Sequence, residues 1–329
     1  MASTLRLAAK ALLSMLVFYA FLCLIFIYKV AYTDHSCGIS HPNTPADWVI
    51  NLGPKSSLYK AGFTQFDTKK WLTHDFKEVT FPSRHPGVTI HAWHTESDPK
   101  APTIIVSHGI KPNCKAHTEP LMVTALLHQA GFNVLNIDLQ NYGESTHTDS
   151  FIRLGQREYL DVLGAFDWLV QEKKVPSDRV GLVGLSLGAV TSAIAFSKEP
   201  EIKAAWLDSP FVDFDSMFTF ELQRYHLPTF FKYGVYVMAD IVIGTRPNVY
   251  TCRDALTHAD GRAIFLTQGT DDGRIPFEQG LTFVELADHA DVVFDHWFVH
   301  DTDHLDAMFR YPYTYQKKLK NFFNTYLAP

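Results

Sequence analysis

The stretch Gly184-Leu185-Ser186-Leu187-Gly188 lies between an apolar, strand-like run over 179–183 and a helix-like run over 189–196. A serine on a sharp strand-to-helix turn adopts a strained backbone, so the residues two before and two after it must lack side chains. Gly184 and Gly188 meet this requirement. The pattern predicts a nucleophile elbow with Ser186 at its tip, and a plain glycine-rich turn is the alternative.

Two later loops carry the side chains that a serine nucleophile requires. A hydroxyl is a weak nucleophile at neutral pH, so it needs a histidine to accept its proton and a carboxylate to orient that histidine. Asp272 follows the strand-like run 263–267, and His304 follows the strand-like run 292–299. The chain therefore predicts a catalytic triad of Ser186, Asp272 and His304.

A fourth element lies upstream, where the apolar run 104–107 ends in His108 and Gly109. Such a turn commonly points the next backbone N–H at the nucleophile. We expect the N–H groups of Ile110 and Leu187 to form an oxyanion hole. Each such donor stabilises a transition state by about 3 to 4 kcal/mol.

Serine, aspartate and histidine follow one another in chain order, and further short motifs accompany them. These motifs occupy residues 78–83, 88–93, 136–138, 142–145 and 155–161. With them, the chain resembles the α/β-hydrolase superfamily over roughly residues 75–327. It is most similar to bacterial membrane-anchored hydrolases of the serine aminopeptidase-like and BEM46-like group. The resemblance implies an α/β-hydrolase fold and a Ser-Asp-His triad, and it leaves the substrate open.

Two positions depart from that pattern. His85-Pro86-Gly87 stands where the family usually has an Asp-Gly turn, a change that alters a hairpin and not the chemistry. Asp303 precedes His304 where the family often has glycine, so His300 stays an alternative catalytic histidine. Asp208 ends a strand-like run and is an alternative carboxylate.

Strand-like and helix-like runs alternate along the chain. Strands are expected over 77–83, 88–94, 103–108, 133–138, 179–184, 203–208, 263–268 and 292–299, and helices over 117–130, 155–173, 187–198, 277–289 and 305–326. This alternation predicts a mostly parallel sheet with helices on both faces. The active site should then lie outside the carboxyl ends of the strands.

The expected α/β-hydrolase domain covers residues 77–329, a size that buries a large core. Within it, residues 209–260 separate two strands by more than a crossover needs, and their many Phe and Tyr residues predict a small cap. These rings favour an apolar or aromatic acyl pocket, unless they only attach the cap to the domain. Residues 31–76 mix prolines with aromatics, which predicts a tether packed on the domain.

Residues 11–28 carry no charge and are long enough to cross a bilayer core. The sequence predicts a cytoplasmic tail (1–10) and a single transmembrane anchor (11–30), with the catalytic domain on the non-cytoplasmic side because positive charges precede the anchor. A cleaved signal peptide is the alternative, although its apolar core should span only about 7–15 residues. A chain without residues 1–32 is expected to be soluble and active.

Composition narrows the possible partners. The net charge of −6 and the lack of a Lys or Arg cluster argue against nucleic acid. No motif calls for a cofactor or a metal ion. Four cysteines (Cys23, Cys37, Cys114 and Cys252) show no C-x-x-C spacing, so reduced, buried thiols are expected, with one disulfide at most.

The sequence as a whole predicts a serine hydrolase that acts through an acyl-enzyme. The expected substrate is a small-molecule or lipid-like carboxylic ester, with thioesters and short peptides as variants of the same chemistry. An acyltransferase with the same triad and a non-catalytic, hydrolase-like binding scaffold are the alternatives.

Overall fold

A single eight-stranded sheet forms the centre of the computed structural model, which describes residues 2–328. The strands run in the order β1-β2-β4-β3-β5-β6-β7-β8. They are β1 (Phe76–Pro82), β2 (Thr89–Thr95), β3 (Thr103–Ser107), β4 (Asn133–Ile137), β5 (Val180–Leu185), β6 (Ala204–Asp208), β7 (Ala263–Gly269) and β8 (Val293–Val299). The pairs β1/β2 and β2/β4 are antiparallel, and all other neighbouring pairs are parallel. The expected mostly parallel sheet is confirmed.

The five central strands are buried along their whole length, whereas β1 and β8 at the two edges are partly exposed. Burial on both faces explains the nearly continuous apolar runs from which these strands were predicted. The register aligns Ser107 with Gly184, and Leu185 with Asp208. The carboxyl ends of β3, β5 and β6 therefore meet at one edge of the sheet.

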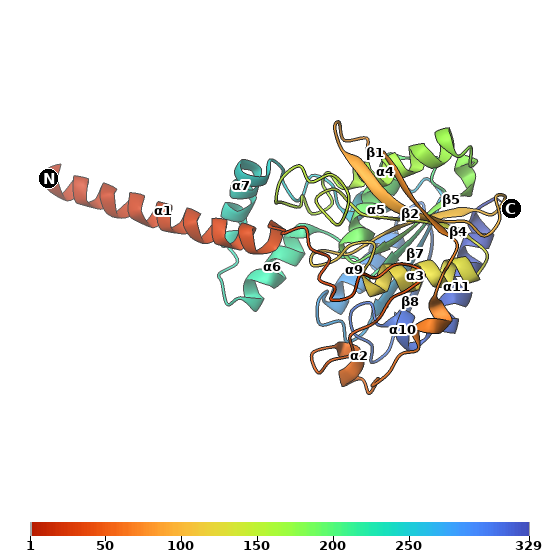
Figure 1. The fold of residues 1–329 in the computed structure, drawn as a ribbon. Helices are drawn as coiled ribbons and strands as arrows, with labels where there is room; N and C mark the ends of the chain where they lie inside the picture. The colour runs from red at the N-terminus through yellow and green to blue at the C-terminus, as the bar shows by residue number, and fades with distance from the viewer. Residues whose placement is uncertain (1, 329) are drawn as a thin grey trace.

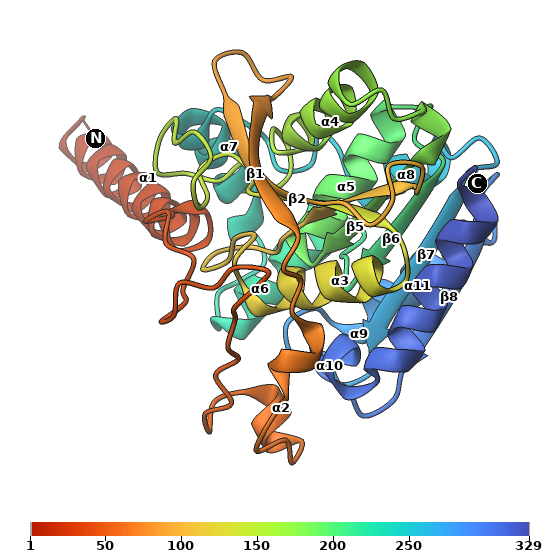
Figure 2. The ribbon, with the colours of Figure 1, turned by 45° about the vertical axis from the view of Figure 1, so that its right-hand side comes forward.

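Helices cover both faces of the sheet (Figure 2). They are α1 (Ala2–Ala31), α2 (Ser57–Lys60), η1 (Thr68–Trp71), α3 (Thr118–Gln129), α4 (Tyr159–Asp167), η2 (Trp168–Glu172), η3 (Ser177–Arg179), α5 (Leu187–Lys198), α6 (Phe214–Arg224), α7 (Phe231–Ile243), α8 (Cys252–Thr257), α9 (Phe277–Ala287), α10 (Ala307–Arg310) and α11 (Pro312–Tyr326). One apolar cluster holds side chains of α3, α10 and α11, and the other holds side chains of α4, α5, α8 and α9. Successive β5 residues alternate between the clusters, as the period of a strand requires.

Two expected helices differ from those observed. The run 305–326 divides into α10 and α11, because Pro312 begins the second helix and has no N–H with which to continue the first. The run 155–173 begins as a turn, becomes helical only at Tyr159, and ends in the wider turns of η2.

Helix α1 projects from the domain, and α7 lies along its second half (Figure 1). It is long and apolar enough over Ser3–Ala31 to cross a membrane. Residues 3–18 are exposed throughout, whereas Cys23, Phe26, Ile27 and Ala31 are buried in the main apolar cluster. The predicted tail and anchor thus form one continuous helix, and its second half belongs to the folded protein. The expectation that a chain without residues 1–32 is soluble and active stays a prediction, and this packing makes the second half of α1 the part that a truncation must test.

A close helix crossing holds α1 against α7. The hydroxyl of Tyr19 donates to the carbonyl of Phe230 (3.1 Å) and accepts from the N–H of Gly234 (3.1 Å). A Cβ atom at Gly234 would lie 2.5 Å from a ring carbon of Tyr19 and 2.6 Å from Cys23 Sγ. Glycine is therefore required where the two helices touch.

The predicted cap region (209–260) contains α6, α7 and α8. Helix α8 packs against α5 on the sheet, so it belongs to the body of the domain. Helices α6 and α7 contact each other and extend toward α1 (Figure 1). Two helices of the predicted cap region, α6 and α7, thus pack together beside α1.

The segment 32–75 lies on the domain with Trp48, Leu58 and Trp71 buried in the second apolar cluster. A disulfide joins Cys37 to Cys114, whereas Cys23 and Cys252 are free and buried. The expectation of reduced thiols is therefore wrong for the first pair. These two cysteines are 77 residues apart, and only the folded chain brings them together.

Candidate active site

Ser186 occupies the turn between β5 and α5 with φ 55° and ψ −117°, a strained conformation for a residue with a side chain. A Cβ atom at Gly184 would lie 2.3 Å from the carbonyl oxygen of Gly188. One at Gly188 would lie 2.2 Å from the carbonyl oxygen of Ser107. Both glycines are thus needed for close backbone contacts, as the sequence pattern requires.

The carboxylate of Asp272 lies at the carboxyl end of β7 and contacts His304. Its Oδ2 is 2.8 Å from Nδ1 of the imidazole, and its Oδ1 accepts the N–H groups of Arg274 (2.9 Å) and Ile275 (2.7 Å). A carboxylate held by two backbone donors cannot turn freely, so it orients the ring and leaves Nε2 available to act on a serine.

The same contact controls the protonation of the histidine. Burial disfavours the charged imidazolium, but the hydrogen bond and the negative charge of Asp272 outweigh it, so the pKa of His304 is raised above its ordinary value. The ring is a stronger base as a result. It becomes fully neutral, and able to accept a proton, only at a pH above that raised pKa.

Asp303 connects the loop that holds His304 to the loop that holds Asp272 through hydrogen bonds. Its Oδ1 accepts the N–H of Gly273 (2.8 Å), next to Asp272, and the N–H of His304 (2.7 Å). From the sequence, Asp303 was recognisable only as a departure from a family pattern. Its position directly before the predicted histidine was a signal that it affects the site. The sequence could not show that it accepts a hydrogen bond from Gly273, which lies 30 residues away.

The predicted oxyanion hole lies between two turns. Gly109 approaches Ser186 so closely that a Cβ atom there would be 3.4 Å from the serine Cβ. Within residues 2–328, the N–H groups of Ile110 and Leu187 donate to no other protein group. His108 shapes this turn, because its Nδ1 is 2.8 Å from the Gly109 carbonyl oxygen and its Nε2 accepts the N–H of Leu139 (3.2 Å). Burial lowers its pKa to about 4, so the ring is neutral.

The alternative residues have other surroundings. His300 is exposed. Asp208 is buried and binds the hydroxyls of Tyr315 (2.7 Å) and Ser209 (3.1 Å) through its carboxylate, and burial raises its pKa to about 6. Its backbone carbonyl accepts the N–H of Ser186 (2.8 Å). Asp208 therefore supports the elbow and does not orient the histidine.

A narrow apolar cavity of about 50 Å³ lies beside Ser186. Its lining includes the two residues of the predicted oxyanion hole, three apolar α6 side chains and Val30 of α1. Glu221 and Arg274 also line it, and they form an ion pair with each other. The cavity therefore offers a mostly apolar environment next to the serine, and its two charged side chains balance each other.

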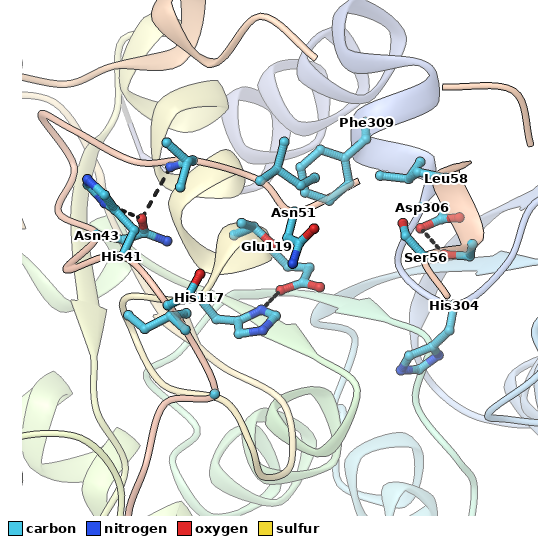
Figure 3. A pocket seen from close by; sticks show the side chains of 17 residues that line it. His41, Asn43, Asn51, Ser56, Leu58, His117, Glu119, His304, Asp306 and Phe309 are labelled. Carbon is cyan, nitrogen blue, oxygen red and sulfur yellow. Dashed lines mark hydrogen bonds and ion pairs between the residues drawn. The ribbon is translucent and has the colours of Figure 1, made fainter. Parts of the chain in front are cut away.

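A second, polar cavity of about 550 Å³ is lined in part by His304 (Figure 3). It is formed by three separate segments: 38–58, the start of α3, and 304–309. His117 and Glu119 form an ion pair in it, and Asp306 lies near His304. No group of three potential metal ligands occurs in the described part of the chain. No sequence motif predicted this cavity.

Three solved structures share the fold. An esterase from Pyrococcus furiosus matches with a TM-score of 0.63 and 20% identity over 80% of this chain and 95% of its own. An α/β-hydrolase from a Penicillium species (0.60, 16%) covers 78% of this chain and 100% of its own. An α/β-hydrolase from Vibrio vulnificus (0.57, 17%) covers 75% and 81%. At these identities the similarity concerns the fold.

The sequence itself matches the prolyl oligopeptidase family over residues 120–329, which is more than half of the chain. The match includes Ser186, Asp272 and His304 but begins after Ile110. No curated protein sequence matches the chain. The serine aminopeptidase-like and BEM46-like subgroup stays a prediction. The fold and the family match together show that this chain is a hydrolase of the prolyl oligopeptidase family, within the α/β-hydrolase superfamily.

Proposed function

We propose that the protein is a serine hydrolase that cleaves carboxylic esters through an acyl-enzyme. The observation that carries this proposal is the hydrogen bond between His304 and Asp272 at the same sheet edge as the strained serine turn. A nucleophile, a base and an orienting carboxylate are the groups with which a Ser-His-Asp triad performs acyl transfer.

In the proposed reaction, Ser186 Oγ attacks the ester carbonyl carbon while Nε2 of His304 accepts the hydroxyl proton. The negative charge then develops on the carbonyl oxygen, where the N–H groups of Ile110 and Leu187 donate to it. The imidazolium returns its proton to the leaving alcohol oxygen as the C–O bond breaks. A water molecule attacks the acyl-enzyme by the same steps and releases the acid and free Ser186.

An apolar, uncharged acyl group fits the cavity beside the serine. The acidic side chain there, Glu221, is already paired with Arg274, so it is a poor partner for the α-amino group of an aminoacyl substrate. This favours ester hydrolysis over aminopeptidase activity. The cavity of about 50 Å³ is far smaller than a typical ligand pocket of roughly 300–1,000 Å³, so a long acyl chain requires α6 to shift.

Peptide hydrolysis is the second candidate, because the family that matches the sequence is named for peptidases. Both reactions use the same proposed residues and differ in the leaving group. p-Nitrophenyl esters of graded chain length, compared with aminoacyl p-nitroanilides, separate the two. We expect the ester of a short apolar acid to be cleaved fastest, and preferential cleavage of the anilides would reverse the assignment.

Two further measurements separate the remaining alternatives. Labelling of Ser186 by a fluorophosphonate distinguishes an enzyme from a binding scaffold. Product analysis with a competing alcohol distinguishes hydrolysis from acyl transfer, since an acyltransferase gives mainly the new ester.

We propose that α1 anchors the protein in a membrane, with the domain on the non-cytoplasmic side. The exposed apolar surface of residues 3–18 supports the anchor, and the disulfide favours an oxidising compartment. On α7, Tyr233, Val237 and Ile241 are exposed at intervals of about one turn, which suits contact with lipid. Carbonate washing of membranes tests this: the chain should stay bound, whereas a mature form beginning near residue 32 would indicate a signal peptide.

A further inference from the structure

The two cavities beside the catalytic residues have opposite character. We propose that the polar cavity beside His304 binds the leaving group of the substrate, and that this group is an uncharged, hydroxyl-rich alcohol such as glycerol. The inference rests on the proposed function, since it assigns the second half of an ester to the site already described.

The chemistry of acyl transfer decides which cavity takes which half of the substrate. The acyl carbon must lie between the nucleophile and the oxyanion donors, and Ser186, Leu187 and Ile110 all line the apolar cavity. The leaving oxygen must receive its proton from the histidine. His304 lines the polar cavity, so the alcohol leaves on that side.

The lining of the polar cavity suits hydroxyl groups. The side chains of Asn51 and Ser56 can each donate and accept hydrogen bonds. The hydroxyl of Ser57 already donates to Asp306 and can still accept a hydrogen bond. Among the described residues that line it, none is Lys or Arg, so a phosphate or carboxylate would find no lasting positive partner. The cavity of about 550 Å³ lies within the usual range for small-molecule sites, which leaves room for a polyol.

The charged groups of this cavity are largely balanced. Nδ1 of His117 contacts the Glu119 carboxylate, so the two charges compensate each other (Figure 3). Asp306 accepts a hydrogen bond from Ser57 on Oδ1 (3.0 Å), whereas its buried Oδ2 has no protein partner within residues 2–328. Burial raises the pKa of Asp306 to about 6. An acceptor without a partner favours a hydroxyl donor from the ligand.

The segment 38–58 covers this cavity and is attached to the domain at both ends. The disulfide of Cys37 with Cys114 holds its start, and the amide of Asn43 donates to the Ala116 carbonyl (3.2 Å). At the far end, the Ser57 hydroxyl donates to Asp306. The polar cavity is thus a built part of the fold, formed where the tether meets the catalytic loops.

Esters that share one short acyl group and differ only in the alcohol provide the test, with the full chain in detergent. The substrates are the glycerol monoester, the ethyl ester, the p-nitrophenyl ester and the glycerol phosphate ester. We expect kcat/KM for the glycerol ester to exceed that for the ethyl ester by about tenfold or more, as one or two added hydrogen bonds would produce. A faster reaction of the phosphate ester would overturn the proposal.

Two variants test whether the polar cavity causes the preference for the glycerol ester. Asn51→Leu and Asp306→Asn should each lower the ratio of glycerol ester to p-nitrophenyl ester kcat/KM by about tenfold, whereas the matched surface change Asn321→Leu should leave that ratio unchanged. Unchanged ratios in both cavity variants would refute the leaving-group site. The variant Ser186→Ala distinguishes a failure of the leaving-group site from a failure of the proposed function. Retained hydrolysis in this variant would refute the proposed function itself.

Discussion

The two walls of the cavity beside Ser186 are built in different ways. On one side, turns after β3, β5 and β7 are held by hydrogen bonds to neighbouring strands and loops. On the other, Phe214 and Met217 of α6 and Val30 of α1 contribute apolar contacts. Hydrogen bonds fix direction and apolar packing does not. We infer that the first wall carries the chemistry and that the second selects the acyl group.

The variant with the largest expected effect removes the hydroxyl of the proposed nucleophile. Ser186→Ala should reduce kcat by a factor of up to about 10⁶, the scale of losses for a serine triad, because no other hydroxyl replaces it. Rates with p-nitrophenyl esters and fluorophosphonate labelling measure the effect, and an unchanged Tm shows that the fold is retained. A loss of less than about tenfold would show that another group is the nucleophile.

His304→Ala should match that loss, and the double variant should be no worse, because the two residues act as a unit. His300→Ala is the control, since its side chain is exposed. If His300→Ala were inactive and His304→Ala were nearly normal, His300 would be the catalytic base.

The next largest effect concerns the carboxylate and pH. His304 must be neutral to accept a proton, and its pKa is raised mainly through Asp272, so kcat/KM should fall as pH drops through that raised pKa. Asp272→Asn should lower kcat by about 10⁴. It should also move the acid limb of the kcat/KM profile to lower pH, because the stabilising negative charge is gone. If the acid limb of the kcat/KM profile stayed at the same pH, Asp272 would not be the carboxylate that raises the pKa of His304.

Truncation compares the two parts of α1 directly. Removal of residues 2–18 should leave Tm and esterase activity unchanged in detergent, because these side chains are exposed. Removal of residues 2–31 should destabilise the domain by several kcal/mol, since each large buried side chain such as Phe26 or Ile27 contributes about 1.5–3 kcal/mol. Thermal unfolding of both forms checks this. Equal stability would show that the second half of α1 is dispensable.

A smaller loss is expected for the residue that joins the two catalytic loops. Asp303→Ala should lower kcat by about tenfold, because the N–H groups of Gly273 and His304 lose their shared acceptor. Asp303→Asn should restore most of the activity, since an amide oxygen can accept both bonds. If the Asn variant were as impaired as the Ala variant, the charge of Asp303 and not its geometry would be important.

The smallest change affects selectivity alone. Val30→Phe should fill the narrow cavity and reduce kcat/KM for octanoate relative to acetate esters severalfold, with acetate hydrolysis nearly unaffected. Val30→Ala is the matched opposite change and should favour the longer chain. An equal loss of kcat/KM for both esters would show that Val30 affects the reaction itself and does not select the acyl group.

Much of the fold was predictable because its signals are local. Each central strand is a short apolar run, and the elbow needs its two glycines within five residues. The expected strands agree with the observed ones to within about a residue. Asp272 and His304 were predicted from their positions after strands, and their hydrogen bond is consistent with that prediction.

The features that tertiary structure decided all depend on contacts between distant segments. The disulfide of Cys37 with Cys114, the bond from Asp303 to Gly273, and the polar cavity each join parts of the chain that no local pattern connects. The second half of α1 is the clearest case. An apolar helix has the same composition whether lipid or protein covers it, so the amino-acid pattern shows only that residues 11–28 avoid water. Only the packing of α6 and α7 decided that part of this helix is covered by protein.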